Sequence, residues 1–274
     1  MSSTFELTIR PRKGWQPIDF KEVYLYRELL VFLVWRDIKI RYRQTLLGGL
    51  WAILQPFIAM LIFSFIFNRL AHVQSDGAPY KLFAYAGLAP WTFFSTAVTQ
   101  SANSLITSQQ LVSKVYFPRI FIPLGAIGAL LVDLFLSLGL FAAMMLYYRW
   151  PVTSALFCLP VFMLGAVLAA AGAGLILSAL NVSFRDVKYA VPFMVQMGLF
   201  LTPVIYPAHY VPARWRALMG LNPMAGVVIG FRHALLGSQA SWGVMGLSLG
   251  ISVFLFVAGL LIFRRMENRF ADII

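Results

Sequence analysis

Residues capable of covalent or metal chemistry are few in this chain, and they do not form a catalytic pattern. The three histidines, His72, His209 and His233, are isolated and lack the spacing of metal ligands. Residues 246–250 (GLSLG) match a nucleophile-elbow string, but they lie inside an apolar stretch, where close helix packing explains the glycines better. No G-x-x-x-x-G-K-[ST] string occurs, so the sequence predicts no P-loop and no enzyme activity in this chain.

A second group of polar residues is spaced for contacts rather than for catalysis. Thr92, Thr96, Thr99 and Asn103 fall within about 60° of one helix face. Aromatic and amide side chains are spaced similarly in two other apolar stretches. Trp51 and Gln55 share a face in residues 50–70, and Phe193 and Phe200 share a face in residues 189–206, with Gln196 at its edge. Aromatic rings beside hydroxyls and amides suit a sugar, which has apolar C–H faces and a hydroxyl rim. The alternative is helix packing, with Ser and Thr bonded to their own backbone.

Asp133 is the only acidic residue deep inside an apolar stretch. An ionised carboxylate there would cost about 2.5–3.5 kcal/mol to insert, so it should be protonated, paired or facing water. A proton-coupled transporter would need several such groups with cationic partners, and the sequence offers none near Asp133. We interpret Asp133 as a contact inside a helical bundle, and a proton relay is the alternative.

The elements that carry these residues are six apolar stretches, each near the roughly 20 residues that an α-helix needs to cross a bilayer. The hydrophobic content of 60% and the mean hydropathy of +0.79 exceed the norm for soluble domains. The predicted spans are residues 50–70, 82–104, 120–147, 155–180, 189–206 and 243–263. The predicted fold class is an all-α integral membrane protein with six transmembrane helices. Residues 1–49 form a cytoplasmic N-terminal segment, and residues 50–274 form the six-span domain.

The net charge of +12 reflects topology rather than nucleic-acid binding. Most of the 22 Lys and Arg residues fall on one side if the N-terminus is cytoplasmic. This asymmetry follows the positive-inside rule for six spans and predicts that both termini are cytoplasmic.

Three segments outside the spans carry further predictions. Residues 22–47 read as an amphipathic interface helix, whose cations meet anionic membrane lipids and which is also able to contact a cytoplasmic partner. Residues 105–118 could form a short helix that docks on another protein, but an ordinary connecting turn is the simpler interpretation. Thr202 to Pro207 breaks the fifth span with two prolines. Residues 211–236 are predicted to form two short interfacial or re-entrant helices, with an external loop as the alternative.

Several strings together resemble ABC-2-type permeases that export bacterial polysaccharides. They are residues 47–56 (LGGLWAILQP), 115–119 (VYFPR), 184–186 (FRD), 202–207 (TPVIYP), 221–224 (LNPM) and 230–232 (GFR). They occur in the expected order and cover roughly residues 20–270. The resemblance is closest to permeases of O-antigen and teichoic-acid exporters and weaker to capsule exporters.

The resemblance implies a homodimer in the bacterial cytoplasmic (inner) membrane, paired with two cytoplasmic ATP-binding cassette subunits that bind ATP and Mg²⁺. It implies export of a lipid-linked, O-antigen-like polysaccharide through a channel at the dimer interface. The implied channel residues are Trp51, Gln55, Trp91, Thr92, Thr96, Thr99, Phe193, Gln196 and Phe200. The implied contacts with the ATPase are Arg36, Lys39, Arg41, Arg43, Ser108, Gln109, Lys114, Arg185 and Asp186. The resemblance implies that residues 208–238 form the outer gate, and the residues assigned to the gate are Tyr206, Arg214, Trp215, Arg216, Asn222 and Arg232.

Other functions stay open at this point. An ABC-2 exporter of a small molecule or a lipid, or of teichoic acid or a capsule polymer, would share the six spans. A membrane-embedded enzyme acting on lipids would need His, Asp or Glu clustered at one depth, and the sequence shows no such cluster.

Overall fold

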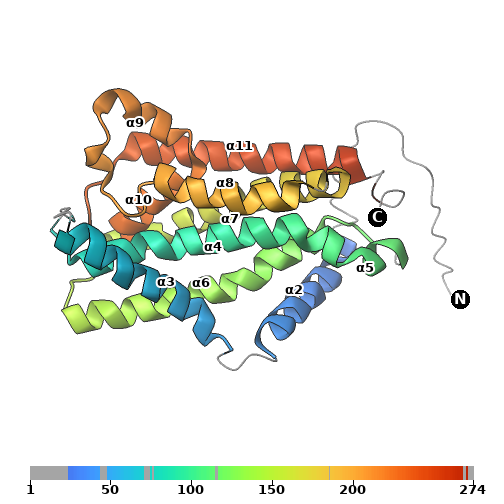
Figure 1. Cartoon of the computed structure of the whole chain (residues 1–274), viewed down its shortest axis with the longest axis horizontal. Helices are drawn as coiled ribbons and strands as arrows, with labels where there is room; N and C mark the ends of the chain where they lie inside the picture. Colours follow the sequence, from blue (N-terminus) through green and yellow to red (C-terminus); the bar gives the residue numbers. More distant parts are fainter. Residues whose placement is uncertain are drawn as a thin grey trace, which may run out of the picture.

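The computed structural model describes residues 24–43, 48–70, 75, 77–114, 117–184, 186–267 and 270. Arg185, one of the residues expected to contact the ATPase, lies outside the described residues. The described part of the chain is helical and contains no strand. Its long helices run roughly side by side, with α2 and α5 at one end of the bundle and α9 and α10 at the other (Figure 1).

The helices follow the apolar stretches of the sequence closely. They are α2 (Arg27–Tyr42), α3 (Leu50–Phe63) continued by the π-helix η1 (Ser64–Leu70), α4 (Tyr80–Thr107), α5 (Gln109–Lys114), α6 (Phe121–Tyr148), the 3₁₀-helix η2 (Ser154–Cys158) leading into α7 (Leu159–Ser183), α8 (Val187–Leu201), the 3₁₀-helix η3 (Ala208–Tyr210), α9 (Ala213–Gly220), α10 (Pro223–Leu236) and α11 (Trp242–Glu267).

Four of these helical stretches are long and apolar enough to cross a membrane: Leu50–Leu70, Phe121–Tyr148, Ser154–Ser183 and Trp242–Glu267. The other two predicted spans correspond to α4 and α8, which differ in kind. Helix α4 has 28 residues but a lower hydropathy, because it carries Ser, Thr and Asn. Helix α8 has only 15 residues, because the chain leaves the helix at Thr202, before the first of two prolines.

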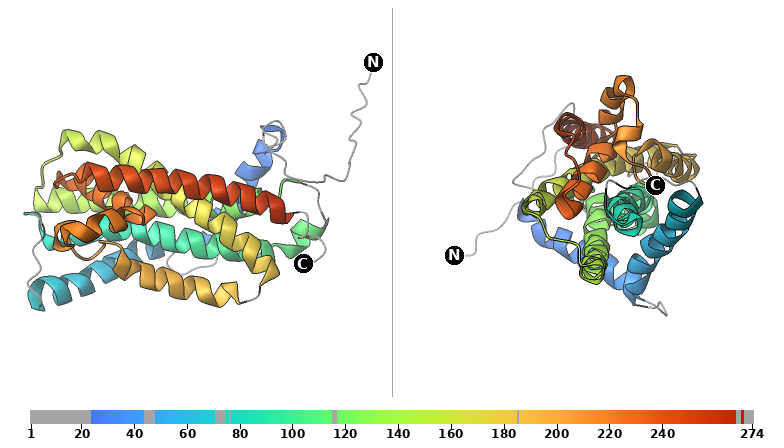
Figure 2. Two further views of the ribbon diagram at one scale, coloured as in Figure 1. Left: turned by 90° about the horizontal axis from the view of Figure 1, so that it is seen from above. Right: turned by 90° about the vertical axis from the view of Figure 1, so that its left-hand side faces the viewer.

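Helix α4 lies at the centre of the bundle (Figure 2). It packs against α3, α6, α7, α8 and α10. Tyr85 and Phe83 are among its fully buried side chains, and the ring of Tyr85 stacks on Phe141 of α6. Its neighbours are therefore mainly protein, which explains how it tolerates more polar residues than the outer helices.

Helices α7 and α11 approach one another to backbone contact. A Cβ added at Gly172 would lie 2.5 Å from the backbone of Leu255, and one added at Gly259 would lie 2.6 Å from the carbonyl oxygen of Gly172. Small residues at such positions let apolar helices pack closely when lipid gives no hydrophobic drive for association.

Helix α2 packs on the bundle, which its prediction as a surface helix did not include. Leu33 is buried against α6, where a Cβ at Gly125 would lie 3.2 Å from the Cβ of Leu33 and one at Gly128 would lie 2.8 Å from Val34. Its other side exposes the large apolar residues Val31, Phe32 and Trp35. The helix therefore turns apolar residues away from the protein, as a membrane-bound element does.

The interpretation of residues 105–118 as a connecting turn is wrong. Helix α4 continues to Thr107, and α5 follows as a separate short helix. Val112 of α5 is buried in a second apolar cluster at this end of the bundle. The cluster joins Leu33 of α2, Leu105 of α4, Phe117, Leu175 of α7 and Phe263 of α11. Burial of this apolar face supplies the stability that the short polar segment lacks by itself.

Candidate functional site: polar cavities along helix α4

The predicted polar stripe of α4 is half-buried and lies along two cavities. Part of it is bonded to its own backbone: the Thr99 hydroxyl donates to the carbonyl oxygen of Ser95 at 2.8 Å, and the Asn103 amide donates to that of Thr99 at 2.8 Å. A hydroxyl that donates to the backbone still has lone pairs to accept a hydrogen bond from a ligand. The polar stripe therefore fits both interpretations that the sequence left open. Its side chains bond to the helix backbone, and its hydroxyls are still able to accept a hydrogen bond from a sugar.

The first cavity, here called the α3–α4 cavity, has a volume of about 190 Å³. Its lining residues come from α2, α3, α4, α6 and the turn before α3: Arg41, Tyr42, Gly48, Trp51, Ala52, Gln55, Thr92, Phe93, Thr96, Leu130 and Asp133. Four of the predicted channel residues, Trp51, Gln55, Thr92 and Thr96, therefore meet at one cavity. An indole, an amide and two hydroxyls around one space form a surface able to bind a polyhydroxylated ligand.

The second cavity, here called the α2–α4 cavity, is larger, with a volume of about 570 Å³, and lies nearer the α5 end. Its lining residues are Arg36, Asp37, Ile40, Arg41, Thr99, Gln100, Asn103, Ser104, Thr107, Ser108, Gln110, Leu111, Ile122, Ala126 and Ala129. Arg41 lines both cavities, so the two cavities share one cationic side chain.

Asp133 has a cationic partner, contrary to the sequence analysis. The carboxylate of Asp133 is paired with the guanidinium of Arg41 at 2.6 Å and accepts a hydrogen bond from the Tyr42 hydroxyl. Burial and this hydrogen bond raise the pKa of Tyr42, so the hydroxyl stays protonated and continues to donate. Local sequence gave no signal of the pair, because its members are 92 positions apart. The prediction that Asp133 is a contact inside the bundle fits this geometry.

The predicted channel residues of α8 lie outside both cavities. Phe193, Gln196 and Phe200 are exposed on the outer side of α8. Trp91 is buried instead, and its ring lies against α8, 2.9 Å from where a Cβ on Gly198 would stand. Trp91 therefore joins α4 to α8 and lines neither the α3–α4 cavity nor the larger cavity beside α2.

The residues expected to contact an ATPase gather at the α2–α5 end of the bundle. Lys39, Arg43, Gln109 and Lys114 are exposed there, as is Asp186, which precedes α8. Arg36 and Arg41 point into the cavities, and Ser108 lines the larger one.

A network of hydrogen bonds and an ion pair around Glu267, which the sequence analysis missed, connects helices at this end. The carboxylate of Glu267 in α11 accepts from the backbone N–H of Arg119 at 3.1 Å and from the Arg264 guanidinium at 3.3 Å. The Arg119 guanidinium donates to the Glu267 carbonyl oxygen at 2.7 Å.

At the opposite end of the bundle, the side chain of Arg232 in α10 stabilises the irregular segment that follows α8. This guanidinium is buried and donates to the carbonyl oxygens of Pro203 at 2.6 Å, Phe83 at 3.2 Å, Tyr206 at 3.3 Å and Val204. It also stacks on the Phe83 ring, 3.5 Å from the centroid. The carbonyls of a broken helix end thus find donors inside the protein.

Asn222 secures the same break from its other side. Its amide donates to the Thr202 hydroxyl at 2.8 Å, and its side-chain oxygen caps α10 by accepting from Met224 N at 3.0 Å. The two predicted short helices exist as α9 and α10, although α10 is buried among α4, α7 and α11.

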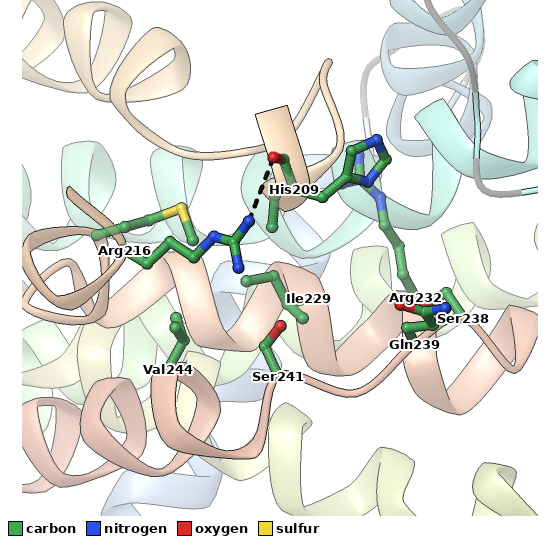
Figure 3. A pocket seen from close by; sticks show the side chains of 10 residues that line it. His209, Arg216, Ile229, Arg232, Ser238, Gln239, Ser241 and Val244 are labelled. Carbon is green, nitrogen blue, oxygen red and sulfur yellow. Dashed lines mark hydrogen bonds between the residues drawn. The ribbon is translucent and has the colours of Figure 1, made fainter. Parts of the chain in front are cut away.

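A third, smaller cavity of about 120 Å³ lies beside this break (Figure 3). We call it the outer pocket, and its lining residues are Ala208, His209, Arg216, Met219, Ile229, Arg232, Ser238, Gln239, Ser241 and Val244. The predicted gate residues Arg214 and Trp215 are exposed on α9 and lie outside the lining.

Membrane-length apolar helices around polar cavities that run along the bundle define a membrane transport protein. The chain belongs to the ABC-2 type transporter family, whose sequence pattern matches residues 28–236.

Similar proteins support this assignment over nearly the whole chain. An O-antigen export system permease protein RfbA from Myxococcus xanthus is 34% identical over 260 residues, covering 92% of this chain and 97% of that protein. The protein of the same name from Klebsiella pneumoniae is 29% identical over 252 residues, with 92% and 96% coverage. The polysialic acid transport protein KpsM of Escherichia coli is 27% identical over 241 residues, with 85% and 91% coverage.

Proposed function

We propose that this chain is the transmembrane subunit of an ATP-driven exporter that moves a lipid-linked polysaccharide across the bacterial cytoplasmic membrane. The α3–α4 cavity carries the proposal, because Trp51, Gln55, Thr92 and Thr96 offer an apolar ring face together with hydrogen-bonding groups. The names of the similar proteins support a glycan as the cargo.

The functional unit is a homodimer whose copies meet at the α3–α8 side, and the placement of amides supports this. Several polar side chains of α6, α7 and α11 are turned into the protein: Ser137, Ser178, Asn181, Ser248 and Ser252 are all buried. Gln196 of α8 is exposed instead, and so is Gln55 of α3, which also lines the α3–α4 cavity. An amide is costly in hydrocarbon, so a second copy or a water-filled path between copies must cover this side.

Six spans fit the dimensions of α4 and α8, and the distribution of Lys and Arg along the sequence supports cytoplasmic termini. Helix α4 would extend about 42 Å, more than the bilayer core of about 30 Å requires. Helix α8 would extend only about 22 Å, and the buried segment Thr202 to Ile205 carries the chain further. Irregular backbone at membrane depth is tolerated where protein satisfies its polar groups, as Arg232 does here.

Two cytoplasmic ATP-binding cassette subunits, which bind ATP and Mg²⁺, drive the transport from the α2–α5 end. The exposed polar residues of α5 offer a contact surface, and the buried side of α5 shares an apolar cluster with α2 and α11. A displacement of α5 by the ATP-binding subunits is therefore transmitted to α2 and α4, which line the α2–α4 cavity.

Export of the lipid-linked polymer by intact cells tests this proposed function. Deleting the gene should cause lipid-linked polymer to accumulate on the cytoplasmic side, and the wild-type gene should restore export. Gln196→Leu should reduce export, by about tenfold if one hydrogen bond of the translocating glycan is lost. Met194→Leu, at an exposed neighbouring position on α8, should leave export unchanged.

Assembly with the ATPase is measured in the same strains by co-purification and should be normal in both variants. Normal surface polymer in the deletion strain would reject a polysaccharide cargo and leave a small molecule or a lipid as the substrate. Accumulation of teichoic acid or of capsule polymer instead would change only the kind of glycan.

A further inference from the structure

The outer pocket has the composition of an anion site. Three of its lining residues are His209, Arg216 and Arg232, and its lining contains no Asp or Glu. Ser238, Gln239 and Ser241 add hydroxyl and amide groups along its rim. Converging donors with an excess of positive charge favour a negatively charged ligand over a neutral one.

The two arginines differ in what they can offer a ligand. All three nitrogens of Arg232 donate hydrogen bonds to backbone carbonyls. Arg232 therefore contributes positive charge to the pocket and is held in place as part of its lining. Arg216 uses Nε on the Val211 carbonyl oxygen at 3.1 Å and Nη2 on that of His209 at a long 3.5 Å. A guanidinium has five N–H donors, so Arg216 keeps donors for a ligand, Nη1 among them.

The direction of the side chains agrees with this division of roles. In Figure 3 the guanidinium of Arg216 reaches in from α9 on one side of Ile229, and the hydroxyl of Ser241 points toward Ile229 from the other side; all three residues line the pocket. The space is about 120 Å³, whereas a single water needs only about 10–15 Å³ on the same measure. The pocket is therefore large enough for a tetrahedral oxyanion.

We propose that the outer pocket binds a phosphate or diphosphate group, with Arg216 as the main ligand-binding residue. Phosphate oxygens accept several hydrogen bonds at once, and a guanidinium fork matches their geometry better than an ammonium group does. A membrane surface offers two sources of this group: the headgroup of an anionic phospholipid, and the diphosphate that joins a glycan to its carrier lipid. The inference does not depend on the proposed function, because either source would fill the pocket.

Binding of radiolabelled inorganic pyrophosphate tests the proposal. The full-length chain is purified in a maltoside detergent, which carries no phosphate, and pyrophosphate is titrated without Mg²⁺. Saturable binding is expected for the wild type, and Arg216→Gln should bind at least about tenfold more weakly, because it loses charge-assisted hydrogen bonds. Arg216→Lys should restore part of the affinity, since it keeps the charge and loses the fork.

Arg214→Gln is the matched control. Arg214 is two positions away on the same exposed helix, stacks over Trp215 at 5.7 Å and does not line the pocket. Arg214→Gln removes the same charge as Arg216→Gln from a chain with a net charge of +12. A loss of pyrophosphate affinity shared by both variants would therefore be non-specific. Equal affinities for the wild type and Arg216→Gln, a shared loss in both variants, or no saturable binding would overturn the proposal.

A competition arm separates the two sources. Phosphatidylglycerol is added to the micelles at increasing mole fraction, with phosphatidylcholine as the comparison. Displacement of pyrophosphate by phosphatidylglycerol from the wild type would identify a lipid headgroup as the occupant. Retained pyrophosphate binding would instead assign the pocket to the diphosphate of the cargo.

Discussion

Asp133 and Arg232 are charged side chains that the bundle encloses, with exposed fractions of 9% and 3%. Each is satisfied by groups from distant parts of the chain: Asp133 by two residues of α2, and Arg232 by carbonyls of α4 and of the segment after α8. A buried charge without such partners would cost several kcal/mol, so these contacts fix where α2 and α8 can lie.

Removing the charge of Asp133 should loosen α2. Asp133→Asn leaves Arg41 without its counter-charge, and we expect it to lower the free energy of unfolding by about 1–3 kcal/mol, less than for a fully buried pair because Arg41 is partly exposed. Thermal unfolding in detergent measures the change. Asp37→Asn removes a more exposed carboxylate, paired with the adjacent Arg36, and should cost about 0–1 kcal/mol. Equal losses in both variants would contradict this account.

Arg232→Met should destabilise the outer end of α8 more strongly. It leaves several buried carbonyls unsatisfied at about 1–3 kcal/mol each, so we expect a loss of at least about 3 kcal/mol. Arg232→Lys should recover only part of the loss, because an ammonium group cannot span carbonyls in a planar fork. Thermal unfolding, with the exposed Arg214→Met as the control, measures the difference, and full recovery by Lys would refute the role of the fork.

At the scale of elements, glycines decide how closely the helices approach. Helices α7 and α11 touch at Gly172 and Gly259, and α2 touches α6 at Gly125 and Gly128. At Gly139 of α6, in contrast, an added Cβ meets nothing within 4 Å. The same residue type therefore has opposite consequences at different positions along the bundle.

Gly172→Ala should force α7 and α11 apart, because the new methyl group meets the backbone at Leu255, which cannot rotate away. We expect a loss of about 1–3 kcal/mol from overpacking. Gly139→Ala, in open space on α6, should instead be neutral or stabilise by about 0.5–1 kcal/mol through helix propensity. The melting temperatures of the two purified variants give the comparison, and a loss at Gly139 as large as that at Gly172 would show that contact is not the cause.

At the scale of the whole molecule, apolar residues cover most of the outside, so apolar exposure does not distinguish lipid from a second copy. Phe200 of α8 and Phe254 of α11 are exposed to similar fractions, 55% and 69%. The exposed amide of Gln196 on α8 supports the proposal that a second copy covers the α3–α8 side.

Crosslinking distinguishes the two sides. Cys158 is the single cysteine, so Cys158→Ser gives a cysteine-free background. In that background, Phe200→Cys should give a crosslinked dimer in native membranes with a bifunctional thiol reagent, whereas Phe254→Cys should not. Gel mobility reads the result, and dimers from Phe254→Cys alone would place the interface on α11.

Much of the bundle could be predicted from the order of residues alone. Hydropathy over about 20 residues located six helical stretches, and the helical repeat placed Thr92, Thr96 and Thr99 on one face. Two prolines likewise predicted the break after Leu201, and the apolar and Trp–Arg composition of residues 211–236 predicted the two helices that follow. These features depend on neighbours within a few turns, so a sequence reveals them.

Only the tertiary structure decided which polar residues meet. It paired Arg41 with Asp133, turned Trp91 into the contact with α8, made a helix of residues 109–114 and gathered Arg216 and Ser241 around one pocket. Each outcome depends on which faces of distant helices come together, and that choice is set by the packing of the whole bundle. Helical periodicity is a local property of the chain, whereas contacts between elements depend on burial and close fit across it.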